Sequence, residues 1–250
     1  MMKTSFLTIF CSFENQAVVE ETLPSIIRET RDQDARLIVH DSSVRDRDRK
    51  WAYLRELNRE GDFFLLLSDN LSMAHARNMC LHLGQEMYAP EYICMVEDDH
   101  GYHPGFISAM TAAMLGYYGK TAPNQLRFGL FTGCREHNPR NRAAVEEGHT
   151  YPKPDSPPKH MGKANSCCRC APTAHWNNVL KGYDTDEYPI SLFQTANLNL
   201  RNYHKGFTSM VVGDGRHMFS VPNQGRGTSS AAGDRLWNDE YAASDPRSRA

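Results

Sequence analysis

The first 133 residues alternate short apolar runs with longer amphipathic segments, and this alternation restricts the fold more than any other feature of the sequence. The apolar runs are rich in β-branched and aromatic residues, whereas 48–60 carries Trp51, Leu54 and Leu57 at helical spacing. Strands that alternate with helices predict an α/β fold with a mostly parallel sheet and helices on both faces. The expected strands are 5–13, 35–41, 61–67, 92–98 and 126–133, and the expected helices are 18–30, 48–60, 73–88 and 105–118.

The second half of the chain has no regular period. Residues 135–165 contain five prolines and several Lys and Arg side chains, which predicts a long loop or flap. A helix is expected near 173–182, and further structured segments at 191–207 and 211–221. We therefore expect an α/β half (1–133), an irregular second half of the same domain (134–222), and a polar C-terminal tail (223–250) that is flexible or orders with ligand.

The composition argues against two broad classes of protein. Hydrophobic residues make up 40% of the chain and charged residues 23%, as in ordinary globular proteins, and the formal net charge of -2 lacks the basic excess of a general nucleic-acid binder. No apolar run approaches the ~18 residues that a transmembrane helix needs. The N-terminal MMKTSFLTIFCSFEN is interpreted as the first strand rather than a signal peptide, because Glu14 and Asn15 stand where small residues would mark a cleavage site.

Acidic residues stand where two of the expected strands end. Asp41 closes one apolar run, and Glu97, Asp98 and Asp99 close another. In an open parallel sheet, ligands bind outside the carboxyl ends of the strands. Mg²⁺ and Mn²⁺ prefer carboxylate oxygen and usually take only one or two carboxylates together with substrate phosphates. These acids therefore predict a site for Mn²⁺ or Mg²⁺ bound with a nucleotide diphosphate; the alternative is a solvated acidic turn that caps the helix beginning near Pro104.

Four stretches add a family resemblance to this pattern. They are FENQAVVEETLPSII (13–27), LIVHDSSVRD (37–46), LSMAHARNMCL (71–81) and YICMVEDDHGYHP (92–104). In this order and spacing they resemble the family 2 glycosyltransferases, whose nucleotide-sugar-binding fold is called GT-A. The resemblance covers about residues 5–118 and implies a GT-A-type, Rossmann-like sheet, with 1–133 binding the donor and 134–222 facing the acceptor.

The resemblance assigns roles to residues of the first half. Asp41 would accept a hydrogen bond from the nucleobase, and Arg77 would lie near the base, unless it is an ordinary helix-surface arginine. Glu97 and Asp99 stand at the two acidic positions of the family's Asp-x-Asp motif. Asp99 would bind the metal and Asp98 the ribose or donor sugar, although which of the two touches the metal stays open. The first strand-to-helix loop would also contact the donor, through Ser12, Phe13 and Glu14.

Three residues of the second half complete the expected site. Asp214, in KGFTSMVVGDGRHMF, matches the family's catalytic base and would imply inversion at the anomeric carbon; otherwise it is a turn aspartate and a retaining mechanism remains open. His217 is a candidate metal ligand or a structural histidine. Arg226, in NQGRGTSS, would offset phosphate charge in a loop closing over the diphosphate, unless this segment is a plain linker.

The cysteines pose a separate question. Their odd number, seven, favours a reducing, cytoplasmic setting. Cys167, Cys168, Cys170 and His175 include soft zinc ligands, but adjacent cysteines do not match common finger spacings, and we favour an acceptor-side loop with buried thiols. Three nearby aromatic residues are candidates for stacking on a sugar, or ordinary core residues: Trp176, Tyr183 and Tyr188.

The expected function is therefore metal-dependent transfer of a sugar from a nucleotide diphosphate, with a UDP-sugar as the expected donor, to a hydroxyl acceptor. Two alternatives stand beside it. A sugar nucleotidyltransferase would need a glycine-rich basic loop after the first strand, and CSFENQAVVEE has none. A non-catalytic or zinc-stabilised binding protein on the same fold would show no metal-dependent nucleotide binding.

Overall fold

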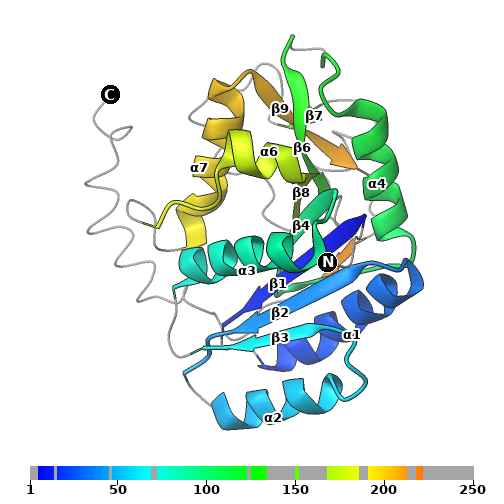
Figure 1. Cartoon of the computed structure of the whole chain (residues 1–250), viewed down its shortest axis with the longest axis vertical. Helices are drawn as coiled ribbons and strands as arrows, with labels where there is room; N and C mark the ends of the chain where they lie inside the picture. The colour runs from blue at the N-terminus through cyan, green and yellow to red at the C-terminus, as the bar shows by residue number, and fades with distance from the viewer. Residues whose placement is uncertain are drawn as a thin grey trace.

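The computed structural model describes residues 5–13, 16–44, 47–68, 72–122, 125–133, 150–151, 168–185, 191–212 and 218–221. An eight-stranded sheet with the order β3-β2-β1-β4-β8-β6-β9-β7 runs through it (Figure 1). The strands of this sheet are β1 (Phe6–Ser12), β2 (Arg36–Asp41), β3 (Phe64–Leu67), β4 (Tyr92–Glu97), β6 (Arg127–Gly133), β7 (Thr150–Tyr151), β8 (Cys168–Pro172) and β9 (Phe207–Val212).

The sheet is mostly parallel, as predicted. β1 lies between β2 and β4 and runs parallel to both, and β3 continues the parallel order beyond β2. β8 is antiparallel to its neighbours β4 and β6, whereas β9 runs parallel to β6. A separate two-stranded sheet pairs β5 (His100–Tyr102) with β10 (Met218–Ser220) in antiparallel register. Strands from both halves of the chain therefore build one continuous sheet.

Helices cover both faces of the sheet because successive strand residues alternate between two hydrophobic cores. Phe6 and Phe10 of β1 pack on one face, with apolar residues of α1 (Gln16–Asp32), α2 (Arg47–Leu57) and α4 (Phe106–Tyr117). Leu7 and Ile9 pack on the other, with α3 (Met73–Tyr88), a π-helical turn (Trp176–Leu180) after α6 (Thr173–His175), and α7 (Ser191–His204). Within the described residues, none of these helices combines the length and apolar character that crossing a membrane requires.

Two expectations about individual elements have clear outcomes. The helix predicted over 73–88 is confirmed, and Ser72 caps it by accepting a hydrogen bond from the backbone N–H of His75 at 3.4 Å. The loop expected around 166–176 is wrong over Cys168–Pro172, which forms the central strand β8. The sequence gives little sign of this strand, because five residues without a β-branched or aromatic side chain show no strand pattern. The two strands that hold β8 in place lie far from it in sequence.

Candidate active site

The carboxyl ends of β1, β2 and β4 bring the predicted acids to one edge of the sheet. Ser12 pairs with Asp41 across β1 and β2, and Cys11 pairs with Glu97 across β1 and β4. The backbone N–H of Phe13 approaches a carboxylate oxygen of Asp98 at 3.5 Å, so the loop after β1 also reaches the acids. Five of the residues predicted for the donor and metal site in the first half therefore lie in or beside this edge: Ser12, Phe13, Asp41, Glu97 and Asp98.

Asp41 is buried and fully engaged by protein donors. It accepts hydrogen bonds from the Ser12 hydroxyl at 2.7 Å, from Ser43 N–H and hydroxyl at 3.0 Å each, and from the Trp51 indole N–H at 3.0 Å. The Lys50 ammonium lies 2.5 Å from the same carboxylate. Burial alone would raise the pKa of Asp41, but Lys50 and the other donors outweigh burial and hold the pKa below its ordinary value. A carboxylate has about four lone-pair positions, so a nucleobase N–H would have to replace one of these donors.

Glu97 forms ion pairs with two buried arginines. Arg77 of α3 reaches one carboxylate oxygen at 2.5 Å, and Arg169 of β8 reaches the other at 2.9 Å. Arg169 also lies 3.3 Å from the Tyr183 hydroxyl, and the Arg77 guanidinium stacks 5.1 Å from the Tyr183 ring centre. Burial raises the pKa of Glu97, but the two guanidinium groups together lower it further than burial raises it, so Glu97 stays ionised.

Asp98 and Asp99 face a different environment from Glu97. Both are half-buried, and the Asp99 side chain keeps 32% of its exposure. The Thr22 hydroxyl donates to the Asp98 backbone carbonyl at 2.8 Å, and the Asp99 carboxylate contacts the His100 imidazole. Burial and the neighbouring Asp99 charge raise the pKa of Asp98 to about 7. Two adjacent carboxylates that resist joint ionisation form an oxygen donor set suited to a hard dication.

The β5–β10 pair brings the end of the predicted base segment beside these acids. Ser220 pairs with His100, and the backbone N–H of Val221 donates to the carbonyl of Asp99 at 2.9 Å. Residues 218–221, which follow directly after the predicted His217, therefore adjoin the turn that carries Asp98 and Asp99. Several predicted site residues lie outside the described residues: Glu14, Asp214, His217 and Arg226.

Sequence reasoning missed Arg169 and Lys50. Arg169 is separated from Glu97 by 72 residues, and its strand was not predicted, so nothing in the sequence connected the two. Lys50 stands in the first turn of a helix whose surface carries many charges, and only the fold shows that its side chain is 2% exposed beside Asp41. A cation near each carboxylate was foreseeable on electrostatic grounds, but its position in the sequence was not.

Among the described residues, His175 does not join the cysteines considered as zinc ligands, and the aromatic residues considered for sugar stacking are buried. His175 is buried, and its ring nitrogens contact Asn202 and Tyr118 rather than cysteines. Trp176 is 1% exposed and donates its indole N–H to a β4 carbonyl at 3.1 Å, so it is a core residue and cannot stack on a sugar. Tyr183 is likewise buried, at 3% exposure. Cys167 and Tyr188 lie outside the described residues.

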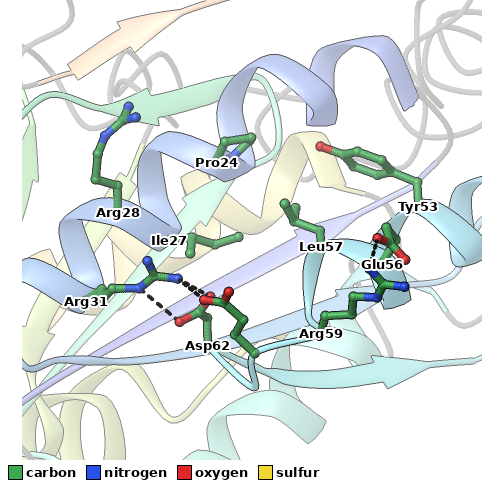
Figure 2. A pocket seen from close by; sticks show the side chains of 10 residues that line it. Pro24, Ile27, Arg28, Arg31, Tyr53, Glu56, Leu57, Arg59 and Asp62 are labelled. Atoms are coloured by element: carbon green, nitrogen blue, oxygen red, sulfur yellow. Dashed lines mark hydrogen bonds and ion pairs between the residues drawn. The ribbon is translucent and has the colours of Figure 1, made fainter.

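A surface groove lies away from this site, between the C-terminal halves of α1 and α2 (Figure 2). Its volume is about 510 Å³, and an ion pair between Arg31 and Asp62, 2.5 Å apart, forms part of its wall. The apolar side chains of Ile27 and Leu57 line the groove together with the charged ones. The groove contains none of the predicted site residues.

No protein-family model and no curated protein matches the sequence. Solved structures do match: the mannosyltransferase PcManGT from Pyrobaculum calidifontis, in complex with GDP-Man and Mn²⁺, has a TM-score of 0.59 at 16% identity, over 90% of this chain and 59% of that one. S. aureus TarS 1-349 in complex with UDP-GlcNAc has a TM-score of 0.61 at 13% identity, over 91% of this chain and 61% of that one. This chain thus spans about three fifths of these proteins' length, and it has the GT-A glycosyltransferase fold that the resemblance of its first half predicted.

Proposed function

We propose that the chain is a metal-dependent glycosyltransferase that moves a sugar from a nucleotide diphosphate to a hydroxyl acceptor. The observation that carries the proposal is that the acids at the carboxyl ends of the strands in this GT-A sheet fall into two electrostatic environments. Asp41 and Glu97 are neutralised by protein cations, whereas Asp98 and Asp99 share a half-buried turn where burial and the Asp99 charge raise the pKa of Asp98. Two fold neighbours contain a nucleotide sugar, and one of them also Mn²⁺.

Asp98 and Asp99 are the residues proposed to hold Mn²⁺ or Mg²⁺. A bound dication would offset the charge that develops on the leaving diphosphate. The loop after β1 supplies the Phe13 backbone N–H beside Asp98, and the same loop is proposed to contact the donor. Glu97 and its two arginines are proposed to position this turn rather than to bind metal, because both carboxylate oxygens already accept hydrogen bonds.

Nucleotide choice is proposed to depend on Asp41. UDP is the first nucleotide to test, because the family resemblance pairs Asp41 with uracil. The Asp41 carboxylate accepts hydrogen bonds from Ser12, Ser43 and Trp51. A base N–H can bind it only if one of these hydrogen bonds is broken. GDP, CDP and ADP in the same panel test whether the base is read here.

The catalytic base is proposed to be Asp214, which would deprotonate the acceptor hydroxyl and give inversion. His217 is proposed as a further metal ligand, and Glu14 and Arg226 as donor contacts. Loss of product formation in Asp214→Asn, with Mn²⁺-dependent nucleotide binding intact, would support the assignment of the base. Unchanged turnover in Asp214→Asn would remove Asp214 from the mechanism.

The decisive experiment measures thermal stability with nucleotide diphosphates and nucleotide sugars, with Mn²⁺ or with a chelator. A nucleotide at 100 times its Kd stabilises the chain by about 2.7 kcal/mol, which raises the Tm by roughly 5–11 °C for a chain of this size. Asp99→Asn should abolish the Mn²⁺-dependent part. Asp32→Asn, the same change at an exposed position at the end of α1, should leave it intact.

The main competing function, a non-catalytic binding protein on the same fold, predicts a different outcome. In that case no member of the panel would shift the Tm in a metal-dependent way, and Asp99→Asn would behave like Asp32→Asn. A shift by one nucleotide that disappears with chelator, followed by release of that nucleotide from its sugar conjugate on adding acceptor, would establish the transferase.

A further inference from the structure

Three buried thiols meet on one face of the central sheet. Cys94 of β4 lies directly opposite Cys170 of β8, and Cys168 is two residues away on the same strand and therefore on the same face. The Sγ atoms of the three cysteines all lie within 4.8 Å of one another. None of the three forms a disulfide, and none has measurable exposure.

The spacing of these sulfur atoms suits a shared metal ion. Metal–thiolate bonds to Zn²⁺ are about 2.3 Å long, so three thiolates around one ion lie roughly 4 Å apart. The three Sγ atoms lie within 4.8 Å of one another, which is close to that separation. Because the cysteines stand on two hydrogen-bonded strands, the backbone already fixes the ligand positions.

Two polar groups beside the thiols add to this geometry. The backbone N–H of Gly133 donates to Cys168 Sγ at a nitrogen–sulfur distance of 3.0 Å. The Tyr102 hydroxyl lies 3.4 Å from Cys94 Sγ. A donor aimed at sulfur stabilises a thiolate more than a thiol, and a hydroxyl oxygen offers either a second such donor or a fourth ligand.

We propose that Cys94, Cys168 and Cys170 form a buried site for a thiophilic metal ion, Zn²⁺ or Cu⁺. Thiolate ligands select these soft or borderline ions over Mg²⁺ and Mn²⁺. Binding releases the three thiol protons to solvent and forms three metal–sulfur bonds, with no change in the oxidation state of sulfur. The site shares Cys168 and Cys170 with the zinc alternative considered from the sequence, and it adds Cys94 of β4.

Such an ion would tie together parts of the chain that are far apart in sequence. It would bridge β4 to β8 and, through Tyr102, would contact β5, which follows Asp98 and Asp99 directly. Tyr102 stacks on Phe106 with ring centres 3.9 Å apart, so the start of α4 belongs to the same packed unit. The proposed ion is structural and stands independently of the proposed transferase activity.

The test is a metal titration of the full chain, reduced and stripped of metal under anaerobic conditions. Zn²⁺ and Cu⁺ are added in separate arms, and the bound ion is counted by native mass spectrometry and elemental analysis. All samples carry Asp99→Asn, so that ions held by the aspartates do not enter the count. The proposal expects a single tightly bound ion per chain in at least one arm, lost in Cys170→Ala and kept in Cys80→Ala, a buried thiol outside the cluster.

A second measurement avoids dependence on variants that fail to fold. Co²⁺ added to the unmutated chain should produce the near-ultraviolet charge-transfer absorption of cobalt–thiolate bonds, which carboxylate ligands do not give. The proposal is overturned if neither Zn²⁺ nor Cu⁺ binds and the cobalt absorption is absent. It is also overturned if Cys80→Ala loses the ion and Cys170→Ala retains it.

Discussion

Replacing Glu97 by glutamine should destabilise the protein strongly, because it removes the carboxylate charge that two buried arginines contact. The Arg77 and Arg169 side chains are each 2% exposed, and Glu97 neutralises both. Removing one member of a buried ion network costs about 3–5 kcal/mol when a charge is left uncompensated. For a chain of this length that corresponds to a loss in Tm of roughly 6–20 °C. Arg169→Met should cost less, about 1.5–3 kcal/mol, because the Arg77–Glu97 pair survives while the hydrogen bonds of Arg169 to Glu97 and Tyr183 are lost.

Urea unfolding followed by circular dichroism at neutral pH measures both variants. Glu56→Gln is the matched control, because Glu56 forms an exposed pair with Arg59 at 2.9 Å and should cost less than about 1 kcal/mol. The reasoning is refuted if Glu97→Gln unfolds like Glu56→Gln, or if Arg169→Met costs more than Glu97→Gln.

The dependence of stability on acidic pH gives a second measurement of the Glu97 contribution. Since the folded-state pKa of Glu97 is lowered, its contribution is complete above the unfolded pKa near 4.5 and is lost as the pH falls through the lower folded value.

Three further outcomes follow from the same structure. The pKa of Asp98 is raised to about 7, so Asp98 takes up a proton on folding between about pH 4 and 7. Asp98→Asn should therefore stabilise the metal-free protein at pH 8 but not at pH 4, as measured by urea unfolding at both pH values. Lys50→Met should cost about 3–5 kcal/mol, because it leaves the buried Asp41 carboxylate without its cation, while the exposed Lys205→Met should unfold like the unmutated chain. Trp176→Ala should cost about 3–5 kcal/mol of stability, because it leaves a cavity in the core. Metal-dependent nucleotide binding of the folded fraction should stay unchanged, which distinguishes a core tryptophan from one that stacks on a sugar.

The first half of the fold was predictable because each of its elements carries a complete local signal. The expected strand at 92–98 corresponds to β4, Tyr92–Glu97, and the helix at 73–88 to α3, Met73–Tyr88. β8 gives no comparable signal, since Cys168–Pro172 contains no β-branched or aromatic residue. Its position depends on pairing with β4 and β6, and such non-local pairing is not visible in a window of neighbouring residues.

The location of the acids was predictable for a related reason, and their individual environments were not. The rule that ligands bind at the carboxyl ends of parallel strands needs only strand boundaries, so it placed Asp41 and Glu97 at one edge correctly. The cations that neutralise them come from α2, α3 and β8, and their contacts span 9, 20 and 72 residues of sequence. Side-chain partners at such separations follow from tertiary packing alone.

The proposed metal site depends on a difference between neighbouring acids. Three consecutive carboxylates repel one another, and a protein can relieve that repulsion with its own cations or with an ion from solution. For Glu97, the protein's own cations relieve the repulsion, because its position on the strand turns its side chain toward Arg77 and Arg169. Asp98 and Asp99 lie past the last residue of β4, where the chain turns toward solvent, and the pKa of Asp98 rises instead of falling. A metal at this turn would therefore remove an electrostatic cost that the protein's own residues leave in place, and this physical reason supports a metal-dependent function.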